Sequence, residues 1–156
     1  MAAKRVPVPI STTVGDAVNT AFCCIEELAG EMRDAFENTP ESLQGSGAGA
    51  AREEAADQLE NIYEPSVPDT VQHLPVVFAL LPLSRRATRS ERLNDGLQYA
   101  MSAIEVMQER IDTDYADEEK LTPEQKDQLA EITECIDNVQ AMIDEAEGVS
   151  FPGMYG

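Results

Sequence analysis

The chain of 156 residues carries 30 acidic and 11 basic side chains, which give it a formal net charge of −19. A chain of this length forms one domain with its own core, so we expect a single helical domain over 1–156. Its three cysteines include no C-x-x-C pair and its longest apolar run, 76–83, is too short to cross a bilayer, which argues against disulfide frameworks, zinc sites, export and membrane insertion. We therefore expect a cytoplasmic protein, or a virion-associated one if the chain is viral.

Apolar residues between Val14 and Phe36 recur at spacings of three, four and seven, which predicts an amphipathic helix over 14–37. Thr13 is placed to cap its first turn, with Asp16 three residues later. The helix is expected to end before Pro40, because the residue preceding a proline is steered away from helical geometry.

Glycines and prolines divide the next part of the chain. Three glycines within 44–49 predict a flexible connector, and a second helix with a mostly alanine face is predicted over 50–63. Four prolines within 64–84 exclude a long helix there. We expect a buried crossover with short helical turns, because no partner strand is evident elsewhere.

Two further helices are predicted in the second half. The third runs from Ser84 or Thr88 to Ile111 or beyond, on the longest continuous apolar pattern in the chain. The fourth ends at 147 and has Thr122 as its N-cap, Pro123 at its first position and a capping box completed by Gln125.

These elements together predict an all-α fold. We expect a four-helix bundle over 13–147, made of two helical hairpins joined by the proline-rich crossover. Extended arms are expected to flank the bundle over 1–12 and 148–156.

Each predicted helix carries net negative charge on its outer face, from −4 over 51–64 to −7 over 122–147. Neighbouring carboxylates on such a face are about 6 Å apart along the helix axis. Rows of this kind are typical of solvated faces, and they are also compatible with mimicry of nucleic-acid phosphates. Direct binding of nucleic acid is disfavoured, because carboxylates repel phosphates. The candidate acidic faces consist of Asp16, Glu27 and Asp34 on the first helix and Asp127, Glu131 and Glu134 on the fourth.

A basic patch of four arginines lies at the start of the third helix: Arg85, Arg86, Arg89 and Arg92. The helix dipole disfavours cations at this end. The patch therefore predicts an acidic surface against it, either within the chain or on a neighbouring subunit, and a basic patch and an acidic body can pair head to tail.

Both ends of the chain are apolar, whereas the termini of soluble proteins are ordinarily polar. Residues 6–10 form a polyproline-like strip, and 149–155 follow the last helix without any charge. We expect these arms either to fold back on the bundle or to dock on a neighbouring subunit. The candidate partner-binding residues are Val6, Val8, Ile10, Phe151, Met154 and Tyr155.

No residue pattern predicts a catalytic, cofactor or metal site. The acidic run 112–119 fails the EF-hand pattern, because Ala116 stands at its fifth position and Pro123 replaces the required Glu. His73 is the single histidine and has no nucleophile motif or E-x-x-H pair beside it, which favours a structural role. Cys23 is expected to be exposed.

The sequence thus predicts a non-enzymatic interaction protein, a structural or assembly component or adaptor of the general kind found among virus and phage accessories. Its expected partners are other protein chains, including copies of itself, and neither nucleic acid nor membranes. The alternative is an inhibitor that mimics nucleic acid and blocks a DNA- or RNA-binding protein. A third hypothesis, an enzyme with a site inside the bundle, is disfavoured because the apolar stripes lack titratable groups.

Overall fold

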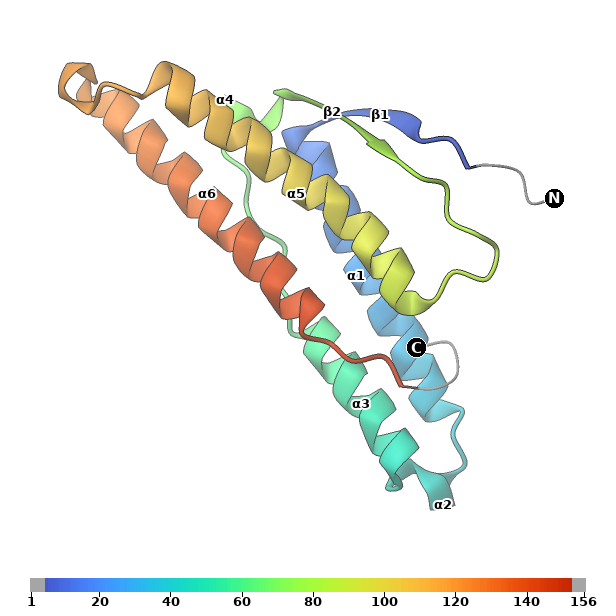
Figure 1. Ribbon diagram of the computed structural model, residues 1–156. Coiled ribbons are helices and arrows are strands. Elements are labelled where there is room, and N and C mark those ends of the chain that lie inside the picture. Colours follow the sequence, from blue (N-terminus) through green and yellow to red (C-terminus); the bar gives the residue numbers. More distant parts are fainter. Residues whose placement is uncertain (1–4, 153–156) are drawn as a thin grey trace.

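The computed structural model describes residues 5–152, in which the chain forms six α-helices, a short 3₁₀ helix and a two-stranded antiparallel sheet (Figure 1). The prediction of a mainly helical chain is confirmed. The sheet was not predicted. It pairs part of the N-terminal arm with part of the crossover.

Helix α1 spans Val14–Glu37, the bounds that the apolar spacing predicts. The side chain of Thr13 accepts a hydrogen bond from the backbone amide of Asp16 at 3.3 Å, which satisfies one free amide of the first turn. The helix is central to the fold, because it packs against both α3 (Gly47–Glu60) and α5 (Arg89–Asp114). Its fully buried large side chains are Val14, Val18, Ile25, Leu28 and Met32.

The glycine-rich segment is helical except for a turn at Gly45 and Ser46, so the prediction that 44–49 forms a flexible connector without regular structure is wrong. A short helix, α2 (Glu41–Gln44), precedes α3, which begins three residues earlier than predicted. Gly49 is buried where the two helices meet, and a Cβ there would lie 2.5 Å from the carbonyl oxygens of Leu43 and Gln44. The absence of a side chain at Gly49 therefore lets the backbones of α2 and α3 approach closely.

The crossover contains the expected helical turn, α4 (Asp69–Gln72), followed by strand β2 (Pro75–Leu80). This strand pairs with β1 (Val8–Thr13), with Val8 opposite Leu80 and Thr12 opposite Val76. The expectation that no partner strand exists is therefore wrong, and the N-terminal arm is part of a sheet. Neither strand alternates strictly between polar and apolar residues, so the pattern that marks a half-buried strand was absent.

Prolines occupy outward positions in this sheet. The amide of Val14 donates to the carbonyl oxygen of Leu74 at 2.9 Å, which sets the alternation of the ladder. By that alternation Pro9 and Pro75 stand where an amide would point away from the partner strand, and Pro7 continues the series on β1. These prolines remove no hydrogen bond between β1 and β2, and Pro7 and Pro9 block the addition of a further strand at the outer edge of β1.

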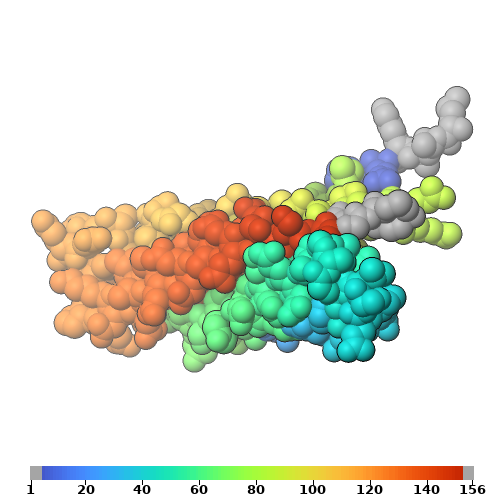
Figure 2. Space-filling view, turned by 90° about the horizontal axis from the view of Figure 1, so that it is seen from below, coloured from blue at the N-terminus to red at the C-terminus, as the bar shows by residue number. Residues whose placement is uncertain are grey.

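The remaining long helix, α6 (Pro123–Glu147), follows a 3₁₀ turn and has the full capping box predicted at Thr122 and Gln125. It packs along α5 and makes few contacts with α3, so a closed four-helix bundle is not confirmed. Figures 1 and 2 show instead an elongated molecule in which α6 and α3 follow one another along its length. A continuous cluster of buried side chains connects all four long helices with β2.

Candidate interaction surfaces

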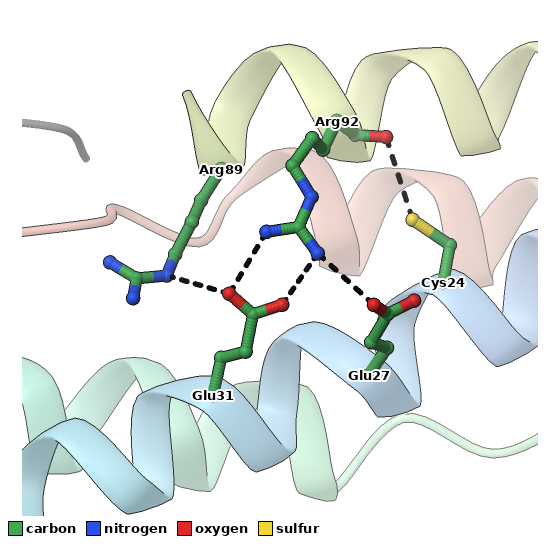
Figure 3. Close-up of polar contacts among 5 residues, drawn as sticks. All are labelled: Cys24, Glu27, Glu31, Arg89 and Arg92. Atoms are coloured by element: carbon green, nitrogen blue, oxygen red, sulfur yellow. Dashed lines mark hydrogen bonds and ion pairs between the residues drawn. The ribbon is translucent and has the colours of Figure 1, made fainter. Parts of the chain in front are cut away.

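An arginine–glutamate cluster joins α1 to the start of α5 (Figure 3). The guanidinium of Arg92 donates to both carboxylate oxygens of Glu31, at 2.9 Å for Nη1, and Nη2 lies 3.3 Å from Glu27. Arg89 approaches the same Glu31 carboxylate, with Nε 3.5 Å from Oε1. Glu27 and Glu31 lie one turn apart on α1, so both carboxylates face the first turn of α5. They offset the unfavourable interaction of its arginines with the positive end of the helix dipole.

The cluster shifts the titration of its members. The hydrogen bond from Arg92 holds the pKa of Glu31 below its ordinary value, and the same bond raises the pKa of Arg92. On the other side of α1, the guanidinium of Arg33 contacts Asp57 and Glu60 of α3. Helix α1 is thus tied by ion pairs to both helices against which it packs.

The structure divides the predicted basic patch into two parts. Arg89 and Arg92 face an acidic surface within the chain, which is one of the two alternatives left open by the sequence. Arg85 and Arg86 are exposed in the loop 81–88 between β2 and α5, and no ion pair involves them within the described part of the chain. Only this second pair remains available to an acidic group on another molecule.

The two strands form an uncharged surface that the sequence analysis did not identify. Residues 75–80 and 8–13 contain no charged side chain. On the outer face, Val77 is 71% exposed and lies opposite Ser11, with Pro9 and Ala79 beside them, whereas Val76 on the inner face is fully buried. The lack of charge over 74–84, in a chain with 41 charged residues, is the sequence signal that could have indicated it.

Exposed apolar side chains gather at this sheet. Within residues 5–152, seven large apolar residues are exposed, and five of these lie on β1, on β2 or in the segments directly beside the two strands. No acidic residue occurs within 5–15 or 74–90. We call this region the apolar tip and define it by Val6, Val8, Val77, Leu81 and Leu83 together with Arg85 and Arg86.

The arms have different environments. Val6 and Val8 are exposed, whereas Ile10 is partly buried opposite Phe78. After α6, Val149 is buried and Phe151 packs against the core, so this part of the C-terminal arm folds back on the helices. The other two predicted residues of that arm, Met154 and Tyr155, lie outside the described residues.

The predicted acidic faces are largely solvated. Asp16, Asp34, Asp127, Glu131 and Glu134 are all exposed, and none of the ion pairs described for 5–152 involves them. Glu27 is the exception, because it contacts Arg92 and so interrupts the row on α1. The row on α6 has no ion pair to a residue of 5–152, and Glu131 and Glu134 line a recess of about 260 Å³ beside Val67 and Pro68.

An open recess of about 470 Å³ lies between the start of α1 and 64–73 and brings together Asp16, Glu64 and His73. This proximity was not predicted, because the three residues are far apart in sequence. Asn19 donates a hydrogen bond to Glu64 at 2.9 Å, but no hydrogen bond among the described residues links His73 to either carboxylate. Within 5–152, the recess therefore shows no hydrogen bond that would orient His73 against a carboxylate.

Searches against family models, curated proteins and solved structures returned no match to this chain. Within residues 5–152, no group of three or more His, Cys, Asp or Glu side chains is arranged to hold a metal ion. No helix of that part is both long and apolar enough to cross a membrane.

Proposed function

We propose that this chain is a non-enzymatic assembly component or adaptor that contacts other protein chains through its apolar tip and its charged faces. The observation that carries the proposal is the contrast between the apolar tip and the rest of the molecule. A chain with a net charge of −19 keeps five exposed large apolar side chains together, with two arginines and no carboxylate among them. Apolar surface gathered in one place and bordered by polar groups is typical of protein–protein contacts.

The tip is also built for contact through side chains. Prolines at the outer edge of β1 oppose strand addition there, which protects the sheet from indiscriminate edge pairing. Its outer face still offers Val77 and small neighbouring residues to a partner. A partner would cover this face and the loop 81–88 instead of extending the sheet.

Affinity capture with a matched pair of variants tests this proposal. The tagged chain, its Val77→Asp variant and its Ala130→Asp variant serve as baits in an extract of the native cells; both positions are exposed, on the sheet and on α6. We expect partner chains to bind the wild type and Ala130→Asp and to be lost with Val77→Asp, because a charge on the apolar face must be desolvated on binding. Equal capture by all three, or no capture by the wild type, would contradict the proposal.

The acidic row on α6 favours nucleic-acid mimicry as the alternative. Asp127, Glu131 and Glu134 are exposed, and none of them forms an ion pair with another described residue. Nucleic-acid mimicry predicts a different result in the same capture experiment. A captured nucleic-acid-binding protein that DNA displaces, and whose binding weakens steeply with salt, would support mimicry in place of assembly through the tip.

A further inference from the structure

We propose that the apolar tip binds a second copy of this chain head to tail: the loop 81–88 of one copy enters a recess at the C-terminal end of α5 on the next. This inference rests on the proposed function and names one partner for it. It follows from the unequal distribution of charge and apolar surface along the molecule.

The loop supplies the apolar and basic groups. Leu81 is 54% and Leu83 is 42% exposed, and the next residues after Ser84 are the exposed Arg85 and Arg86. With no acidic residue within 74–90, nothing in that stretch neutralises these two arginines. The space-filling view shows the loop projecting from one end of the molecule (Figure 2). A partner must therefore offer both an apolar pocket and negative charge.

The recess supplies the complementary groups. It has a volume of about 270 Å³ and is lined by Leu74, Pro75 and Val106, with Glu109 and Asp114 among its polar residues. Arg110 in its wall is already paired with Asp114 at 2.6 Å. The surrounding chain is strongly acidic, because 105–119 contain seven carboxylates and one arginine. A leucine can lie on the apolar lining while the arginines that follow it meet this acidic rim.

The positions of the two surfaces require separate copies. The recess lies at the first residue of β2 and the loop follows its last, so they are roughly 20 Å apart for a strand of this length. One copy therefore cannot fill its own recess. A contact between two different surfaces is heterologous, and it produces a ring if the rotation closes and an open filament if it does not.

Charge also selects this orientation over others. Contacts between two helical faces would place carboxylates against carboxylates, which opposes association. The apolar tip is the part of the described chain with arginines and no carboxylates, so it is the surface that another copy attracts. Head-to-tail contact satisfies this attraction while the other acidic faces stay in solvent.

Sedimentation of the purified full chain over a concentration series tests the proposal. We expect the sedimentation coefficient to rise with concentration beyond that of a monomer. Arg85→Glu with Arg86→Glu on the loop, or Glu109→Lys at the recess with Asp112→Lys in the acidic segment next to it, should each weaken self-association by roughly tenfold or more, since each pair opposes like charges. All four residues are exposed, and none of them is in an ion pair within 5–152. Glu53→Lys with Glu54→Lys on α3 is the control for the recess variant, because it raises the net charge by the same amount at positions away from both surfaces.

Mixing the two weakened variants is the decisive experiment. Each variant alone should associate only weakly. The mixture should recover association, because the reversed loop of one variant meets the reversed recess of the other and the two unchanged surfaces also meet. Leu81→Ser should weaken association at both low and high salt, whereas the effect of the charge reversals should shrink as salt screens them. Circular dichroism confirms that every variant remains folded.

The outcomes separate this inference from the proposed function. A wild type that is monomeric at every concentration, association unaffected by the reversals, or a mixture that does not recover would each overturn head-to-tail assembly. A monomeric chain that still captures other proteins through Val77 would overturn only this inference. Absence of capture by the wild type would contradict the proposed function as well.

Discussion

Burial separates the three thiols of the chain. Cys23 is exposed, as the sequence predicts, while Cys24 is partly buried and its Sγ donates to the carbonyl oxygen of Arg92 at 3.5 Å. Cys135 is 2% exposed, and burial raises its pKa from the ordinary 9.0 to about 11. Because the thiolate is the reactive form, the environment of each thiol sets its reactivity.

We predict that brief alkylation of the folded protein at mildly alkaline pH modifies Cys23 first and Cys135 last. Cys135 should react only as fast as the protein opens, since its thiol is both covered and protonated. Peptide mass spectrometry over time measures the three rates, and the same reaction in denaturant is the control in which the differences disappear. Equal rates for Cys135 and Cys23 in the folded protein would show that the packing of α6 against the rest of the chain does not bury this thiol.

The raised pKa of Cys135 also has a consequence for stability. A group whose pKa rises on folding contributes stability at pH values below its unfolded pKa, here 9.0. That contribution is lost as the pH rises toward about 11, because the thiolate would have to form in a buried position. This loss of stability at alkaline pH comes from Cys135 alone and does not involve the ion pairs of α1.

At the scale of the elements, close packing of α1 on α5 depends on one glycine. Gly96 is buried on α5, and a Cβ at this position would lie 2.7 Å from Sγ and 2.8 Å from Cβ of Cys24 on α1. Gly30, on the exposed side of α1, has no atom within 4 Å of such a Cβ. Gly30 and Gly96 therefore differ in how closely another helix packs against them, although each lowers helix propensity by a similar amount.

We predict that Gly96→Ala destabilises the protein by about 1–3 kcal/mol, the usual cost of overpacking a well-packed contact, less the gain in helix propensity. Gly30→Ala should instead be neutral or stabilising by up to about 1 kcal/mol, because only the propensity changes. Urea unfolding followed by circular dichroism measures both. A stabilised Gly96→Ala variant would mean that α1 and α5 do not approach this closely.

Charge repulsion acts on the molecule as a whole. Most of the 30 carboxylates have no cationic partner within residues 5–152, where ion pairs involve Arg33, Arg89, Arg92, Arg110 and Lys120. The net charge of −19 favours expansion over the compact state, and salt screens this repulsion over a distance that falls from about 30 Å at 0.01 M to about 8 Å at 0.15 M.

We predict that added sodium chloride raises the urea midpoint of unfolding, because screened repulsion outweighs the weakening of exposed ion pairs. Glu53→Lys with Glu54→Lys lowers the net negative charge and should raise the midpoint at low salt, with a smaller response to added salt. A midpoint that falls with salt would show instead that the ion pairs of α1 dominate the electrostatic balance.

Local signals in the sequence were sufficient for the long helices. The capping residues Thr13 and Thr122 and the apolar spacing after each predicted α1 and α6 at their observed bounds, because caps and helical periodicity act within a few residues of one another. The same local reasoning failed for Gly49 and for Pro9. A glycine that admits a neighbouring backbone and a proline at an outward strand position cannot be distinguished from a flexible linker or a polyproline segment without the partner.

The sequence by itself determined the mainly helical character of the chain, its caps, its acidic outer surface and the presence of a basic patch. Only the tertiary structure decided that Val8–Thr13 pairs with Pro75–Leu80, that Arg89 and Arg92 contact Glu31, and that Arg85 and Arg86 lie beside an apolar face without an ion pair to any residue of 5–152. The physical reason is the range of the interactions: helix formation depends on neighbours along the chain, whereas strand pairing and ion pairs between helices join residues that only the folded chain brings together.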